Sequence, residues 1–122
     1  MTTEHRILVI DDSTDGRESM AELLRLAGYQ VAEAADGQEA IRIAPAFRPE
    51  VVVLDIGLPG MDGFEVARRL RALPETRTAT LIALTGYGQR EMQERSKEVG
   101  FDHHLVKPVQ LDLLERLLPG SR

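Results

Sequence analysis

The 122-residue sequence contains no cysteine and no tryptophan, and it has only three Phe and two Tyr residues. The absence of cysteine excludes disulfides, thiolate metal sites and thiol catalysis, and it is typical of a reducing compartment. Because aromatic residues are so few, the hydrophobic core must be built mainly from aliphatic side chains.

Long apolar runs and an excess of basic charge are also absent. No stretch reaches membrane-spanning length, and residues 1–6 lead into an apolar run without a signal segment, so we expect a cytoplasmic protein. The net charge of −5 and the pI near 5.2 argue against a domain that holds nucleic acid by neutralising phosphates. We therefore expect neither a membrane nor a nucleic acid as a direct partner.

The composition is that of a soluble globular protein, with 43% apolar and 29% charged residues. A chain of this length can bury one hydrophobic core and is too short for two ordinary domains. We expect a single domain over residues 1–122, with its core at about residues 5–119.

Short apolar runs alternate with segments of helical periodicity, which predicts a parallel sheet covered by helices on both faces. The expected strands are residues 7–10, 31–34, 51–54, 81–84 and, less regular, 104–106. The runs at 51–54 and 81–84 are apolar throughout, so we expect them at the centre of the sheet.

Five helices are expected around this sheet. The first has one apolar face and a glycine stop: Met20, Leu23, Leu24 and Ala27, then Gly28. Acidic caps at Asp36 and Asp62 start the second and third helices, and Pro45 is expected to end the second early. The third helix should run toward Pro74, the fourth over about residues 89–99, and the fifth from Leu111 to Leu118.

Polar residues of distinct types follow four of the five expected strands: Asp11 and Asp12, Asp55, Thr85 and Lys107. The carboxyl ends of parallel strands lie at one edge, and a doubly wound sheet holds its ligand there, where the strand order reverses. In the order 2-1-3-4-5 the reversal lies between the first and third strands. This order brings Asp11, Asp12 and Asp55 around one crevice.

Three neighbouring carboxylates repel one another, and at least one of their pKa values rises unless a cation intervenes. Carboxylate ligands with open positions favour a hard divalent ion such as Mg²⁺, which keeps several waters and accepts phosphate oxygens. We therefore expect Mg²⁺ at Asp11, Asp12 and Asp55, where Mn²⁺ could substitute.

Lys107 is one of only two lysines in a chain that has thirteen arginines. An ammonium can follow a single oxyanion, whereas a guanidinium favours planar, bidentate geometry. Thr85 precedes Gly86, which leaves space beside the hydroxyl. Taken alone, Lys107 fits a surface lysine and Thr85 fits a helix cap. Together with Asp55 as a carboxylate nucleophile, they indicate a site for a phosphoryl group.

Over essentially its full length the chain resembles the receiver domains of two-component response regulators. The resemblance rests on four segments in order: Asp11-Asp12, residues 53–63, Leu84-Thr85-Gly86 and Val106-Lys107-Pro108. It implies a flavodoxin-like α/β fold in three layers, with a five-stranded parallel sheet of order 2-1-3-4-5 and five helices.

The resemblance also implies a reaction. Asp55 would accept a phosphoryl group from the phosphohistidine of a histidine kinase or a histidine phosphotransfer domain, and the same site would catalyse dephosphorylation. Mg²⁺ would be held by Asp12, Asp55 and the Gly57 carbonyl, with Asp11 acting through water.

In the same family Thr85 and Lys107 correspond to residues that bind the phosphoryl oxygens, and the peptide before Pro108 is expected to be cis. The family's switch couples the Thr85-type hydroxyl to a Tyr or Phe on the fifth strand, where this chain has His104 after His103. Because adjacent strand residues point to opposite faces, we do not expect this histidine pair to chelate a metal.

We predict that His104→Ala leaves phosphorylation of Asp55 intact and alters binding to a partner. The expected output surface comprises the fourth helix, the fifth strand and the fifth helix. A ring at His104 would couple this surface to the hydroxyl of Thr85. The measurement is the affinity of the phosphorylated and the unphosphorylated protein for the partner. If the variant binds the partner as tightly as the wild type does in both states, this role is contradicted.

Other readings use the same residues. Residues 11–16 and 100–108 also resemble receivers fused to hybrid sensor kinases, where the domain acts as a relay intermediate. Met1 instead suggests a free-standing regulator. An aspartyl-nucleophile phosphatase of the haloacid dehalogenase type also pairs carboxylates with Mg²⁺. It would need an Asp-x-Asp motif and a cap segment.

A nucleotide-binding module would need a glycine-rich loop in place of residues 13–16.

Overall fold

A computed structural model describes residues 5–56, 62–86 and 98–119 of the chain. Its centre is a parallel sheet with the strand order β2-β1-β3-β4-β5. The strands are β1 (Arg6–Ile10), β2 (Gln30–Ala34), β3 (Val51–Asp55), β4 (Thr80–Thr85) and β5 (His103–Val106). The predicted order is confirmed, and each predicted strand is found with one additional residue at one or both ends.

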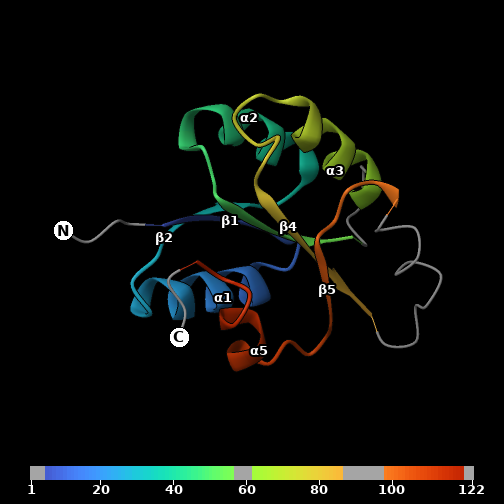
Figure 1. The fold of residues 1–122 in the computed structure, drawn as a ribbon. Helices are drawn as coiled ribbons and strands as arrows, with labels where there is room; N and C mark the ends of the chain where they lie inside the picture. The colour runs from blue at the N-terminus through green and yellow to red at the C-terminus, as the bar shows by residue number, and fades with distance from the viewer. Residues whose placement is uncertain (1–4, 57–61, 87–97, 120–122) are drawn as a thin grey trace.

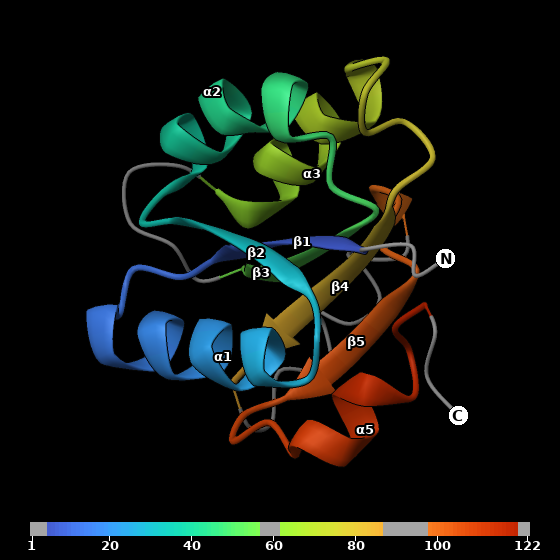
Figure 2. The same cartoon turned by 90° about the vertical axis from the view of Figure 1, so that its left-hand side faces the viewer.

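Helices cover both faces of the sheet, so the predicted three-layer α/β/α architecture is also confirmed (Figures 1 and 2). The described helices are α1 (Thr14–Leu26), α2 (Gly37–Phe47), α3 (Gly63–Ala72) and α5 (Leu111–Glu115). Helices α2 and α3 lie on one face, and α1 and α5 lie on the other. Most of the predicted fourth helix, residues 89–97, lies outside the described residues. No helix in the described ranges is long and apolar enough to cross a membrane.

The interior strands are buried on both faces because their side chains alternate between two hydrophobic clusters. Along β1, Ile7 belongs to the cluster that includes Leu24 of α1, whereas Leu8 belongs to the cluster that includes Phe64 of α3. All four side chains are at most 1% exposed. Burial of each such side chain contributes about 1.5–3 kcal/mol, so both helix layers are needed to hold the strands in place.

Side-chain caps fix the starts of three helices. Asp36 Oδ1 accepts a hydrogen bond from the Glu39 amide at 2.8 Å, and Asp62 Oδ1 accepts one from the Phe64 amide at 2.8 Å. Both predicted caps are therefore confirmed. The start of α1 is capped by Ser13, whose Oγ accepts from the Gly16 amide.

The prediction that Pro45 ends the second helix early was wrong, because α2 continues to Phe47. Proline at this point removes one amide donor close to the helix end, where few turns remain to be disrupted. Phe47 packs against the core, and the next residue, Arg48, donates its amide to the Ala44 carbonyl at 2.9 Å. Tertiary packing therefore carries the helix past the proline.

The predicted apolar face of the first helix was also partly wrong. Leu24 is buried, but Leu23 is 46% exposed and Ala27 is exposed. The residues of α1 that are fully buried are Ala21 and Leu24, which lie one turn apart. The inner face of α1 is therefore centred one position away from the predicted one.

The fifth helix is shorter than predicted and ends at Glu115. Beyond it, the Leu117 amide donates to the Leu114 carbonyl and the Leu118 amide to the Glu115 carbonyl, which are three-residue spacings. The chain therefore tightens into 3₁₀-type turns, as helix ends often do. Leu118 remains 4% exposed, so its burial does not require α-helical geometry.

The start of α3 lies directly against the end of β3. A Cβ atom on Gly63 would stand 2.5 Å from the Cα of Ile56, closer than real Cβ contacts come. Ile56 follows Asp55 in the chain, so this close approach ties the helix to the strand end that carries the carboxylate.

We predict that Gly63→Ala lowers the free energy of unfolding by about 1–3 kcal/mol, since the added methyl group meets backbone that must move. Gly16→Ala is the matched control: its nearest contact would be 3.4 Å, and Ala favours a helix over Gly by about 1 kcal/mol. Urea unfolding followed by circular dichroism measures both variants. Equal destabilisation by the two substitutions would contradict the close-approach argument.

Candidate functional site

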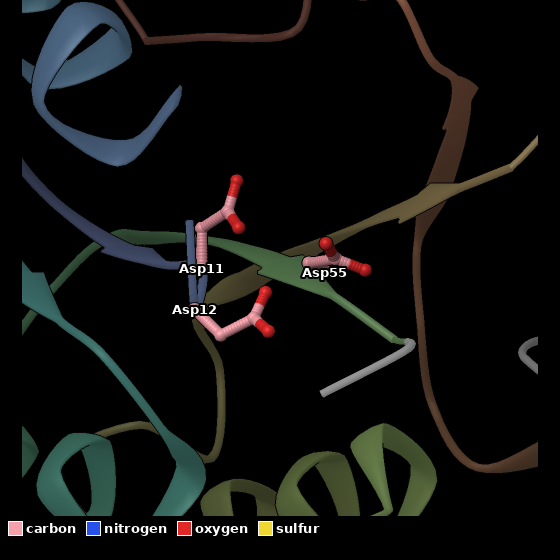
Figure 3. A group of neighbouring side chains, drawn as sticks. All are labelled: Asp11, Asp12 and Asp55. Carbon is pink, nitrogen blue, oxygen red and sulfur yellow. The ribbon is translucent and has the colours of Figure 1, made fainter. Parts of the chain in front are cut away.

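Three carboxylates meet where β1 and β3 end. Asp11 and Asp12 follow β1, Asp55 is the last residue of β3, and the three side chains project into one region (Figure 3). One oxygen from each lies within 4.8 Å of the others. Asp11 and Asp55 are each 8% exposed, whereas Asp12 is exposed. The structure thus brings together the residues that the strand order placed at one crevice.

Asp11 is held at three points. Its amide donates to the Ala34 carbonyl of β2 at 3.1 Å, and its Oδ1 accepts from the Ser13 amide at 3.0 Å. Its carbonyl accepts from Nη1 of Arg17 on α1 at 3.0 Å. The turn that carries the two acidic residues is therefore fixed to both neighbouring elements.

Lys107 brings a cation to the carboxylates from the other side. Its Nζ forms an ion pair and hydrogen bond with Oδ2 of Asp55, and its amide donates to the Thr85 carbonyl at 2.8 Å. The peptide between Lys107 and Pro108 is cis, as expected from the resemblance.

The acidic surroundings change the proton affinity of this lysine. Burial lowers the pKa of Lys107, but the hydrogen bond to Asp55 and the charges of Asp55, Asp11 and Asp12 raise it, and the net pKa lies above its usual value. The ammonium therefore stays protonated at neutral pH beside Asp55.

Thr85 is the last residue of β4, next to Leu84, which pairs in register with Asp55. The side chain is buried, and its Oγ1 has no hydrogen-bond partner among the described residues. Leaving a buried hydroxyl unsatisfied costs about 1–3 kcal/mol. A polar ligand atom at this strand edge would remove that cost.

The donor set fits a hard divalent cation. All three ligand candidates are carboxylates, and one lysine offsets only part of their negative charge. Oxygen-only sites of this kind suit Mg²⁺ or Mn²⁺. The Gly57 carbonyl, which was expected to complete the ligands, lies outside the described residues.

A cavity of about 550 Å³ opens beside Asp11 and Lys107. It lies between α1 and the segment that leads from β5 into α5, and its other lining residues include Ser13, Met20, Leu23, Pro108, Val109 and Leu111. Leu23, which was predicted to be buried, lines this cavity. The edge that carries the carboxylates is therefore flanked by an open and largely apolar surface.

The two histidines lie one strand away from Thr85. His104 of β5 pairs in register with Ala83 of β4 and is half-buried, whereas His103 is exposed. His104 therefore lies on the strand next to Thr85, which pairs in register with Val106 of β5.

Sequence reasoning missed two residues that shape the site, Ser13 and Arg17. Ser13 caps α1 and donates its amide to Asp11. A helix-start pattern after the acidic pair could have revealed it. Arg17 lies seven residues before Leu24, so the correct helical phase could have placed its side chain on the inner face of α1.

The fold and the acidic cluster agree with comparisons to known proteins. The family model described as the response regulator receiver domain matches residues 7–118. The chain belongs to this family of two-component signalling proteins. Members of the family bind Mg²⁺ in their acidic pocket and interact with histidine kinases or phosphotransfer proteins.

Individual relatives support the assignment. Sporulation initiation phosphotransferase F of Bacillus subtilis is 37% identical over 107 residues, which cover 88% of this chain and 85% of the relative. The chemotaxis protein CheY4 of Vibrio cholerae has a TM-score of 0.88 and 33% identity, covering 95% of this chain and 100% of that one. The chain spans only about half the length of several other curated relatives, 51% and 46% in two cases.

A solved relative is described with bound magnesium. The receiver domain of the sensor histidine kinase PA1611 from Pseudomonas aeruginosa is described with a magnesium ion coordinated in its active-site cleft. It has a TM-score of 0.84 and 30% identity, and the match covers 94% of each chain.

We predict that Asp12→Asn raises the free energy of unfolding in EDTA by about 0.5–2 kcal/mol, because one of three crowded charges is removed. The wild type should gain stability when Mg²⁺ is added, and the variant should not, because a ligand is lost. Urea unfolding with EDTA and with excess MgCl₂ measures both effects. Asp15→Asn removes an equal charge from the first turn of α1 and is the control. Destabilisation of Asp12→Asn in EDTA would contradict the crowding argument.

Proposed function

We propose that the protein is a phosphoacceptor switch of a two-component phosphorelay in which Asp55 carries the phosphoryl group. The observation that carries this proposal is the environment of Asp55, which is nearly buried, clustered with Asp11 and Asp12, and contacted by Lys107. A carboxylate with a cation on one side and metal ligands on the other is equipped to attack phosphorus.

The donor would be a phosphohistidine of a histidine kinase or a histidine phosphotransfer domain. A carboxylate oxygen of Asp55 forms a bond to phosphorus while the bond from phosphorus to the imidazole nitrogen breaks and its electron pair returns to the ring. In dephosphorylation, water attacks phosphorus, the bond to Asp55 breaks, and inorganic phosphate leaves. The protein would thus catalyse its own phosphorylation and dephosphorylation without being a classical enzyme.

The acidic residues would hold the cation that this transfer needs. Asp12, Asp55 and the Gly57 carbonyl would bind Mg²⁺, or Mn²⁺ in its place, and Asp11 would act through water. Bound Mg²⁺ would neutralise the negative charge that the phosphoryl oxygens bring to the carboxylates. The exposure of Asp12 supports this role, since it leaves the cluster open to a hydrated ion.

Thr85 and Lys107 would hold the phosphoryl oxygens. The hydroxyl of Thr85 is available because no described residue satisfies it, and the ammonium of Lys107 already lies against Asp55. Charge-assisted hydrogen bonds from these donors would be stronger than those between neutral groups. When the phosphoryl group arrives, Lys107 can turn from the carboxylate to a phosphoryl oxygen.

The resulting change would pass to the surface through Thr85 and His104. Movement of the Thr85 hydroxyl toward the phosphoryl group would alter the space beside β5, where His104 lies. The proposed output surface includes β5, α5 and the fourth helix expected at about residues 89–99. Two exposed apolar side chains support it, Val106 of β5 at 39% and Leu113 of α5 at 41% exposure.

A relay intermediate is the second candidate function, with the same chemistry at Asp55. In that case the phosphoryl group would move on to the histidine of a phosphotransfer domain. The similarity to a phosphotransferase and to a sensor-kinase receiver favours this version. A phosphatase of the haloacid dehalogenase type has no such support from the family match.

We predict that incubation with acetyl phosphate and Mg²⁺ adds one labile phosphoryl group to the wild type and none to Asp55→Asn. Asparagine cannot provide the carboxylate nucleophile, and intact mass spectrometry measures the adduct directly. Asp102→Asn, at the opposite end of β5, is a control that should still be phosphorylated. Turnover of many donor molecules without any adduct would indicate a phosphatase instead.

A further inference from the structure

The inner face of α1 carries one arginine among its buried residues. Arg17 lies four residues before Ala21 and seven before Leu24, a spacing that places all three on one side of a helix. Ala21 and Leu24 are fully buried, and the side chain of Arg17 is only 14% exposed. A cation therefore occupies the end of a core-facing stripe, next to the acidic turn.

The contacts of Arg17 join three elements. Its Nη1 donates to the Asp11 carbonyl at 3.0 Å, and its Nε lies 3.4 Å from Oε1 of Glu33 on β2. Glu33 is also paired with Arg25, whose Nη1 lies 3.3 Å from Oε2. The guanidinium is thus anchored on β2 while it holds the end of β1.

The bound carbonyl belongs to the peptide that links Asp11 to Asp12. A hydrogen bond to that oxygen restrains rotation of the peptide plane, and the peptide plane sets the direction of the Asp12 backbone. The other two anchors of Asp11 hold its amide and its side chain. Arg17 therefore restrains the part of the turn that leads to the exposed carboxylate.

We propose that Arg17 is a positioning residue of the metal site, which sets the Asp12 carboxylate for a divalent cation by fixing the peptide between Asp11 and Asp12. This inference rests on the proposed function, since it assigns Asp12 as a ligand. Residues that orient the ligands of a metal without touching the metal typically weaken metal binding by about 10–100-fold when they are replaced.

The sign of the effect separates positioning from simple electrostatics. Arg17 is a cation close to a cation site, so loss of its charge alone would reduce repulsion and strengthen metal binding. Loss of a positioning contact weakens metal binding instead. A weaker affinity in a folded Arg17 variant can therefore be assigned to geometry.

Arg25 offers a matched control. Arg17→Met and Arg25→Met each remove one ion pair with Glu33, but only Arg17 contacts Asp11. The affinity of each variant for Mn²⁺ alone can be measured from the electron paramagnetic resonance signal of the free ion. We expect binding to be about tenfold weaker in Arg17→Met and within about twofold of wild type in Arg25→Met.

Arg17→Lys keeps the charge but places its donors on one nitrogen, whereas the guanidinium reaches the Asp11 carbonyl and Glu33 through separate nitrogens, so its affinity should fall between wild type and Arg17→Met. Circular dichroism and urea unfolding of all three variants establish that the compared proteins are folded. If Arg17→Met is not folded, Arg17→Lys against Arg25→Lys provides the same comparison.

Phosphorylation kinetics supply a second readout. In Arg17→Met the Mg²⁺ concentration for half-maximal phosphorylation of Asp55 should rise by the same factor as the Mn²⁺ dissociation constant. The rate at saturating Mg²⁺ should stay near that of wild type. A lower saturating rate with unchanged Mg²⁺ dependence would indicate a merely structural role and overturn the proposal.

Two further outcomes would also overturn it: unchanged or tighter Mn²⁺ binding in Arg17→Met, and equal weakening in Arg25→Met. Failure of the proposed function gives a different result. A wild type that binds Mn²⁺ in an Arg17-dependent manner, but is not phosphorylated at Asp55, would contradict the phosphoacceptor function and support the role of Arg17.

Discussion

The crowding of three carboxylates at one edge of the sheet is the constraint on which the rest of the site depends. Parallel strands deliver Asp11, Asp12 and Asp55 to one region, and burial of two of them limits the screening of their charges by water. Repulsion at this distance must be offset by positive charge. Among the described residues, the ion pair between Lys107 and Asp55 places a positive charge against one of these carboxylates. The same excess of negative charge prepares the cluster for a divalent cation.

Packing and hydrogen bonds hold the strand ends that carry the carboxylates close together. Strands β1 and β3 are buried on both faces, and the start of α3 approaches the residue after Asp55 so closely that only glycine fits. Asp11 is bonded to β2 and to α1. The hydrophobic clusters therefore supply the stability that opposes the repulsion at the sheet edge. Rigidity and reactivity are linked, because a cluster that could relax would bind a cation less well.

Much of this arrangement could be predicted from the sequence, since it depends on strand ends. An apolar run followed by Asp55 marks both the strand and the end from which the carboxylate projects, and parallel topology then determines its neighbours. The errors fell where packing overrides local preference. Pro45 stays helical because Phe47 reaches the core, and α5 tightens after Glu115 while Leu118 remains buried. Arg17 was missed because a small error in helical phase hides which polar residue faces inward.

The two cations around the acidic turn differ in kind, and their partners explain the difference. Arg17 faces two fixed acceptors, the Asp11 carbonyl and the Glu33 carboxylate, which a guanidinium can hold together through separate nitrogens. Lys107 faces Asp55, an acceptor whose position and charge would change on phosphorylation. A single ammonium on a flexible stem can follow that change without losing its bond to an oxygen. In a chain with only two lysines, the placement of one beside Asp55 and of an arginine beside fixed acceptors fits the proposed role of Asp55, whose charge would change, and the stationary role of the Asp11 turn.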